Sequence, residues 1–266
     1  MRIKNVHGNT LDHLGEAVVG GRYGADGALP PEPLLCESLG VSRTVVREAV
    51  KSLVAKGLLS TGPKVGTRVQ PADQWNWFDP DVVAWHSRCG LSREFVRDLH
   101  ELRRVVEPAA VSLAAQRATA ADLQHLETAF AGMSAAIRDG GDYVLHDLAF
   151  HQGLLAASHN RMLVHMSKAL AALLRTSFEL STTRPNSAAK SLPNHRAILD
   201  AVIARDPHGA EKAALVLIDN AGREIDIVLA SRRKLPSVAG PARRLAPPDR
   251  RRATASAKTP SVRTRS

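Results

Sequence analysis

The sequence predicts a mainly α-helical protein of two domains, a small helical unit that ends in a two-stranded hairpin and a larger antiparallel helical bundle. Three observations support this fold class. The chain of 266 residues is long enough for two domains. Only 4% of its residues are aromatic while Ala, Leu and Val dominate, which favours helices over sheets. Apolar residues also recur at helical spacing almost throughout residues 91–229.

Two short helices are expected first. Residues 11–19 place apolar side chains on one face and are followed by a pair of glycines that end the helix. A loop rich in Gly and Pro leads to a second helix over residues 32–39, and its prolines suit the first turn, where a missing N–H costs nothing.

A third helix is expected over residues 42–56, after a tight turn at Gly40. Ser42 is its predicted N-cap. Arg43, Thr44, Arg47 and Lys51 lie off its apolar stripe. The stripe itself contains Val45, Val46, Ala49, Val50, Leu53 and Val54. An amphipathic helix with basic and hydroxyl groups in its first turns is typical of a recognition helix in a DNA major groove, although an ordinary surface helix with a basic face fits the same pattern.

Two short strands follow, over residues 58–61 and 66–69, on either side of Gly-Pro-Lys-Val. Three helices and a two-stranded hairpin form a winged helix-turn-helix. We therefore predict a DNA-binding domain over residues 1–70.

Residues 71–90 are predicted to be a linker. Pro71, Asp79 and Pro80 interrupt regular structure, and the segment holds four of the ten aromatic residues of the chain. Those four are Trp75, Trp77, Phe78 and Trp85. Two interpretations remain open: the aromatics fix the linker against the domains, or they stack on a ligand.

The helical pattern of the larger domain, residues 91–232, is divided by short Gly, Pro, Asn or Asp breaks. We predict an antiparallel helical bundle for this domain. Its expected helices lie near residues 91–117, 120–138, 142–157, 160–180, 187–204 and 207–231.

The net charge of +10 is unevenly distributed. Residues 1–70 carry nine basic and six acidic side chains, whereas residues 233–266 carry ten basic and one acidic. This final segment is rich in Pro, Ala, Ser and Thr, so we expect a disordered basic tail. The tail either adds salt-sensitive attraction to DNA phosphates or is a solvated extension without a role.

Cysteine use and hydropathy indicate the compartment. Cys36 and Cys89 lie far apart and form no framework, and no apolar run is long enough for a membrane helix or an export signal. We therefore expect a cytoplasmic protein that has no membrane partner.

Several motifs of the first 70 residues stand in fixed order: Tyr23-x-x-x-Gly-x-x-Leu-Pro-x-Glu, Leu39-Gly-Val-Ser-Arg-x-x-Val-Arg-Glu-Ala and Gly66-Thr-x-Val. They resemble the DNA-binding domain of the GntR family of bacterial transcription regulators. The resemblance implies that Arg43, Thr44 and Arg47, with Ser42 beside them, contact operator DNA. It also implies that Lys64 and Gly66 of the wing reach the adjacent minor groove. Family members usually have a basic or polar residue after Leu-Pro-x-Glu, and Pro33 stands there instead.

The larger domain resembles the effector domain of the fatty-acid-regulator branch of that family, the FCD domain. The resemblance is carried by Glu101-Leu-Arg-Arg-x-x-Glu-Pro-Ala-Ala, Asp147-x-x-Phe-His and Leu192-Pro-x-His-x-x-Ile-Leu-x-Ala-Val. It implies a homodimer. The linker motif, from Trp75 to Trp85, further resembles sugar-acid-responsive members of the family.

Asp147, His151 and His195 are the candidate metal ligands. Asp147 and His151 are four residues apart and share a helix face, and a bundle can bring His195 opposite them. One carboxylate with two imidazoles suits Zn²⁺, Ni²⁺ or a similar divalent ion, but the spacing alone equally permits structural hydrogen bonds. The resemblance implies a metal site. Many relatives supply another His from the last helix, where this chain has Ile218 and Asp219, so Asp219 or a water is expected to complete the shell.

A carboxylate effector also needs cationic groups or hydrogen-bond donors. Arg103 and Arg223 are candidates from the first and last helices of the bundle, and Lys190 and Ser191 are candidates near His195. We expect a ligand-responsive regulator that is not an enzyme, a repressor of sugar-acid catabolism released from its operator by an acid such as galactonate. The alternative is a metal-dependent hydrolase that uses the Asp147 cluster.

Overall fold

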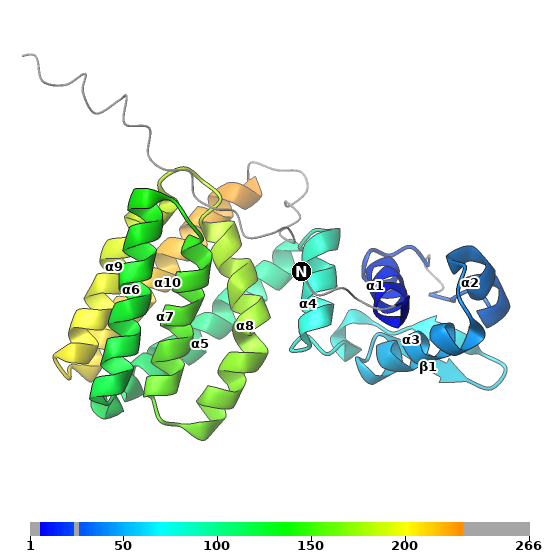
Figure 1. Cartoon of the computed structure of the whole chain (residues 1–266), viewed down its shortest axis with the longest axis horizontal. Coiled ribbons are helices and arrows are strands. Elements are labelled where there is room, and N and C mark those ends of the chain that lie inside the picture. The colour runs from blue at the N-terminus through cyan, green and yellow to red at the C-terminus, as the bar shows by residue number, and fades with distance from the viewer. Residues whose placement is uncertain (1–5, 24–26, 231–266) are drawn as a thin grey trace, which may run out of the picture.

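The computed structural model describes residues 6–23 and 27–230, which form two helical bodies joined through one short helix (Figure 1). The expected basic tail, residues 233–266, lies outside the described residues. Among the described residues, no helix is long and apolar enough to cross a membrane.

The N-terminal body contains α1 (Val6–Val19), α2 (Glu32–Leu39) and α3 (Arg43–Ala55). The chain turns between α2 and α3 at Gly40, whose φ of 63° is easily adopted by glycine, and Ser42 caps α3 by accepting a hydrogen bond from the Val45 amide. The apolar stripe of α3 lies in the core, with Val46, Ala49 and Leu53 fully buried. Val54, which we expected on this stripe, is exposed.

The wing consists of β1 (Leu59–Gly62) and β2 (Gly66–Val69), which pair antiparallel with Leu59 opposite Val69. The turn between them needs positive φ at Lys64 and Gly66, at 67° and 76°. The predicted winged helix-turn-helix is therefore present in the structure.

The linker is more regular than the sequence indicated. It contains the 3₁₀ turn η1 (Ala72–Gln74) and the helix α4 (Pro80–Cys89), in which Asp79 is the N-cap and Pro80 occupies the first turn. Trp85 of α4 is fully buried in the core of the N-terminal body. Lys56 at the end of α3 contacts Asp79 at 2.7 Å and Asp81 at 3.0 Å, so α4 is fixed to the DNA-binding body.

The bundle packs α5 against α7 and α10, α6 against α7 and α9, and α9 against α10 (Figure 1). Its core is built from apolar side chains such as Leu126, Met133 and Phe150. The helices are α5 (Arg93–Arg117), α6 (Ala120–Asp139), α7 (Tyr143–Ala157), α8 (Arg161–Ser181), α9 (Ser187–Ile203) and α10 (Pro207–Ala230). Their bounds agree with the predicted segments to within about two residues.

Candidate functional site

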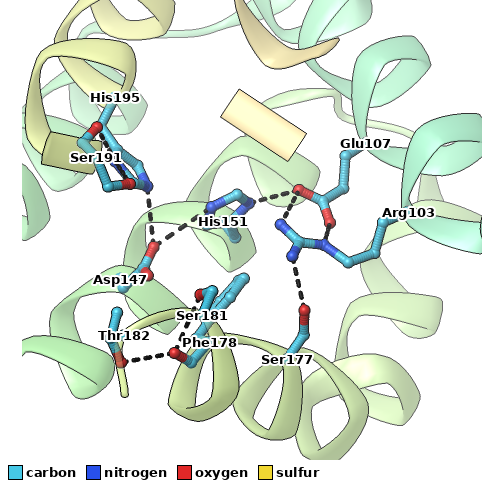
Figure 2. Close-up of polar contacts among 10 residues, drawn as sticks. All are labelled: Arg103, Glu107, Asp147, His151, Ser177, Phe178, Ser181, Thr182, Ser191 and His195. Carbon is cyan, nitrogen blue, oxygen red and sulfur yellow. Dashed lines mark hydrogen bonds and ion pairs between the residues drawn. The ribbon is translucent and has the colours of Figure 1, made fainter. Parts of the chain in front are cut away.

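Three polar side chains converge in the interior of the bundle (Figure 2). Asp147 and His151 lie one turn apart on α7, and His195 reaches them from α9. Asp147 Oδ1 lies 3.0 Å from His195 Nε2 and 3.4 Å from His151 Nε2. All three residues are at least 95% buried, and one potential ligand atom from each lies within 4.8 Å of the others. The structure therefore brings together the three residues predicted as metal ligands.

The second nitrogen of each imidazole has its own partner. His195 Nδ1 lies 3.0 Å from the Ser191 carbonyl oxygen, which accepts its proton, and His151 Nδ1 lies 2.6 Å from Glu107 Oε2. With the proton on Nδ1, each Nε2 presents a lone pair toward Asp147. Three hydrogen-bond acceptors, the Asp147 carboxylate and the two Nε2 atoms, then face one point. A shared proton or a bound cation must offset the repulsion between them.

A buried ion pair extends the cluster toward α8 (Figure 2). Arg103 of α5 donates to Glu107 at 2.5 Å and to the Ser177 hydroxyl at 2.9 Å, and its guanidinium lies 4.8 Å from the centre of the Phe178 ring. Arg103 and Glu107 are each 3% exposed. An unbroken polar chain thus runs from Arg103 through Glu107 and His151 to Asp147 and His195.

Electrostatics in this interior are dominated by the balance between burial and paired charges. Burial raises the pKa of Glu107, but Arg103 and His151 outweigh it and hold the pKa at about 2. The pKa of Asp147 follows the same pattern: burial raises it, but His195 and His151 outweigh burial and bring it well below the ordinary value. Burial lowers the pKa of His151, whereas Glu107 and Asp147 raise it to about 9. Both carboxylates are therefore ionised at neutral pH.

The space beside His151 is closed in this structure. On the side of His151 that faces α10, the apolar space bounded by Leu154 and Leu217 holds no volume that a water molecule can occupy. Tyr143, one turn before Asp147 on α7, is 1% exposed. A small ligand therefore needs a shift of helices or side chains to enter.

The four predicted effector contacts divide into two pairs. Arg103 lies inside the bundle, and Ser191 lies beside His195, with its hydroxyl oxygen 3.3 Å from Nδ1. Lys190 is exposed, and Arg223 is exposed and bonded to Asn220 on its own helix. The structure does not bring Lys190 or Arg223 to the cluster, so the expectation for these two residues is corrected.

The expected fourth metal ligand is also corrected. Asp219 forms an ion pair with Arg104 at the surface, with 42% of its side chain exposed, while Ile218 is fully buried in the apolar core. Neither residue belongs to the group that could hold an ion among the described residues. Of the two completions expected for a metal shell, Asp219 and a water, the structure therefore leaves the water.

The predicted DNA contacts are all exposed on the N-terminal body. Arg43, Thr44 and Arg47 are exposed on the first turns of α3, and Ser42 is exposed at its N-cap. Glu32 of α2 pairs with Arg47 at 2.9 Å and lies 3.7 Å from Arg43. Exposed pairs of this kind are weak, so the two arginines remain available to a phosphate or a base edge. Lys64 and Gly66, exposed in the turn of the wing, complete the predicted set.

Sequence reasoning missed Glu107, Ser177, Phe178 and Tyr143. Glu107 carried a detectable signal, since Arg103 and Glu107 are four residues apart on a helix and form an i, i+4 ion pair. No local pattern marks Ser177 or Phe178, because their partner Arg103 lies on another helix, and none marks Tyr143.

Comparisons with known proteins give a family match for each of the two bodies. Residues 8–69 match the family model described as bacterial regulatory proteins, gntR family, and residues 98–220 match the FCD domain model. The chain is 34% identical over 213 residues to the galactonate operon transcriptional repressor of Escherichia coli K12, with 80% of this chain and 93% of that protein covered. It is 31% identical to the transcriptional regulator LutR of Bacillus subtilis, with 70% and 85% covered.

A solved structure supports the fold. The structure of Lar, described as controlling expression of the Listeria monocytogenes agr system and mediating virulence, aligns with a TM-score of 0.59. The alignment covers 86% of this chain and 100% of that one, at 16% identity. At this identity the likeness concerns the fold alone.

Proposed function

Since this chain belongs to the bacterial GntR family of transcription regulators and carries an FCD domain, we propose that it is a repressor of sugar-acid catabolism released from its operator by a carboxylate effector. The observation that carries this proposal is the buried chain of Arg103, Glu107, His151, Asp147 and His195. It places three side chains that could hold a metal ion, Asp147, His151 and His195, in the same interior as the guanidinium of Arg103.

Operator recognition is assigned to α3. Arg43 and Arg47 offer guanidinium forks, which donate two parallel hydrogen bonds to guanine, and Thr44 offers a hydroxyl between them. Lys64 at the wing turn supplies a charge for the flanking groove. A dimer that presents two such helices reads two half-sites, and we propose a homodimer for this reason.

A divalent ion, Zn²⁺ or Ni²⁺, fits the cluster. The donor set is one carboxylate and two imidazoles, and the second nitrogen of each imidazole is held by Glu107 or by the Ser191 carbonyl, as in the outer shell of metal sites. Bound there, the ion supplies Lewis acidity and charge. Asp147 would hold the ion through a carboxylate oxygen, and His151 and His195 would hold it through Nε2.

The charge of the loaded site favours an anionic effector. Arg103 and Glu107 cancel each other, and Asp147 removes one of the two charges of a divalent ion, so the interior retains one positive charge. One carboxylate neutralises it, and burial makes that balance strongly favourable. We propose Arg103 and Ser191 as the groups that orient such a ligand. The name of the E. coli relative, a repressor of the galactonate operon, indicates a sugar acid as the first candidate.

Effector binding is coupled to DNA binding through the closed bundle. Because the site has no free volume for a ligand beside His151, the bound state differs in helix packing from the state described here. The helix α4 contacts both α1 and α8, so a shift of α8 is transmitted to the DNA-binding body. Effector and operator then weaken each other by a coupling on the order of 1–3 kcal/mol.

The hydrolase alternative gains no support. The matched families and relatives are transcription regulators and not enzymes. The Asp147 cluster also lies beneath closed helices and has no access to water beside His151.

Metal analysis of the purified protein tests the site directly. We expect about one divalent ion per chain in the wild type and a large loss in His151→Ala, with Arg223→Ala as a surface control. Footprinting of the promoter beside the gene for this protein, with and without galactonate and related sugar acids, tests the regulatory role. Metal-free protein that still responds normally to effector would overturn the metal proposal. A footprint that no sugar acid changes would overturn the proposed effector class.

A further inference from the structure

A groove of about 540 Å³ lies where the linker meets the bundle. We call it the junction groove. Trp75, Trp77 and Phe95 line it, together with residues at the end of α1, in η1 and in α8. It therefore contains two of the three tryptophans of the chain and contacts both the DNA-binding body and the effector domain.

The groove is acidic. Among the residues that the structure describes, Asp73, Glu94 and Asp98 line it, and no Lys or Arg does. All three acidic residues are exposed. The ion pair of Asp98 with Arg97, at 3.4 Å, is also exposed and therefore weak. Aromatic faces bordered by carboxylates attract cationic side chains whose carbon stems cover the rings.

A strongly basic segment leaves the described structure beside this groove. Residues 231–266 contain eleven Lys and Arg and one Asp, whereas residues 1–230 are electrically balanced. The Leu229 carbonyl, one residue before the end of α10, accepts a hydrogen bond from Arg93 at 2.5 Å, and Arg93 directly precedes Glu94 of the groove. Leu229 also shares an apolar cluster with Phe95. The segment thus starts next to the groove, and ten extended residues span roughly 30 Å, which is enough to follow it.

We propose that the junction groove binds the basic segment 231–266 of the same chain. Leu235, Val238 and Leu245 lie between the basic residues of that segment, so it offers both apolar contacts for the tryptophans and charges for the acidic rim. A segment held there is withdrawn from DNA phosphates. The groove and DNA therefore compete for the same cations, and release of the segment raises non-specific DNA binding.

Zero-length carbodiimide cross-linking of the full chain tests the contact. The segment has two lysines, Lys234 and Lys258, and mass spectrometry maps the carboxylates to which they are joined. We expect cross-links to Glu94, Asp98 or Asp73 within one chain, lost at about 1 M salt, where the screening length falls to roughly 3 Å. A mixture of isotope-labelled and unlabelled protein separates links within a chain from links between chains. Links between chains, or links spread evenly over surface carboxylates, would overturn the proposal.

Neutral variants supply the second test. The groove variant combines Asp73→Asn, Glu94→Gln and Asp98→Asn. The control variant removes the same charge from exposed positions elsewhere on the bundle: Glu101→Gln, Glu127→Gln and Glu211→Gln.

We expect tryptophan emission to shift with added salt in the wild type and the control, and not in the groove variant. At low salt, the groove variant should bind non-operator DNA on the order of tenfold more tightly than the control. Equal emission and equal DNA affinity in the two variants would refute a docked segment. This outcome is independent of the metal and the effector.

Discussion

Replacing Glu107 with Gln removes the charge that connects Arg103 to His151. The Glu107 side chain is 4% exposed, and its two oxygens lie 2.5 Å from Arg103 Nε and 2.6 Å from His151 Nδ1. Gln keeps the shape but removes the negative charge that neutralises the buried Arg103, and breaking such a pair typically costs about 3–5 kcal/mol. Because the amide retains one acceptor, we expect the lower end of that range. A loss of about 3 kcal/mol lowers the melting temperature by roughly 6–12 °C.

The same change should weaken the metal site. Glu107 accepts the Nδ1 proton of His151 and so fixes the tautomer in which Nε2 is free to bind an ion. Loss of such an outer partner typically reduces metal affinity about 10–100-fold. Competition with a chromophoric chelator measures this affinity, and thermal unfolding measures stability. Ser177→Ala is the matched control, because it removes one hydrogen bond from Arg103 without touching His151. If Glu107→Gln bound metal as tightly as Ser177→Ala, the role assigned to Glu107 would be wrong.

Acid titration gives an independent check on Glu107. Its pKa in the folded protein is about 2, below the ordinary value of 4.5, so its contribution to stability is present above pH 4.5 and is lost as the pH falls toward 2. A shift of this size corresponds to about 3 kcal/mol. The wild type should therefore lose about that much more stability than Glu107→Gln between pH 5 and pH 2, measured by urea unfolding. Parallel losses in the two proteins would contradict the pairing.

Three further changes test other parts of the molecule. Arg47→Ala should weaken operator binding about 5–150-fold in an anisotropy titration, while Arg223→Ala, on the far domain, should leave it unchanged. Gly15→Ala places a Cβ 2.5 Å from the Trp85 ring, so α1 and α4 must move apart. We expect the free energy of unfolding, measured in urea, to fall by about 1–3 kcal/mol. Unchanged stability would show that α1 and α4 are not tightly packed at this point. Metal should stabilise the wild type when the ion is present at about 100 times its dissociation constant. Its removal should then lower the melting temperature of the wild type by roughly 5–11 °C. The melting temperature of His195→Ala should not change.

The helices of this protein were predictable because their signals are local. The stripe on α3, from Val46 to Leu53, and the Ser42 cap specify that helix without reference to the rest of the chain. By contrast, α4 was missed because Asp79 and Pro80 were interpreted as breaks. Both residues are compatible with a helix start, where an acidic side chain caps free amides and proline lacks only an unused donor.

The site was predictable only in part, because its geometry depends on contacts between helices. Glu107 has its decisive partner, His151, on another helix, and no periodicity within α5 reveals it. Arg223 was misplaced for a related reason. Ile218 and Ile225 define the buried face of α10, and at 100° per residue Arg223 points more than 130° away from each of them. A charged residue on a helix can be assigned to an interior site only once the face that the helix turns toward the interior is known.

Operator binding titrated with galactonate, in wild-type protein and in His195→Ala, tests whether an acid bound inside the bundle controls DNA binding. His195 is buried within the bundle, whereas the proposed DNA contacts lie on the N-terminal body. The variant should therefore still bind the operator when no effector is present. We expect galactonate to release the metal-loaded wild type with a loss of affinity of about 5–150-fold, and not to release the variant. Equal release of both proteins would contradict control of DNA binding by an acid bound at the Asp147, His151 and His195 centre.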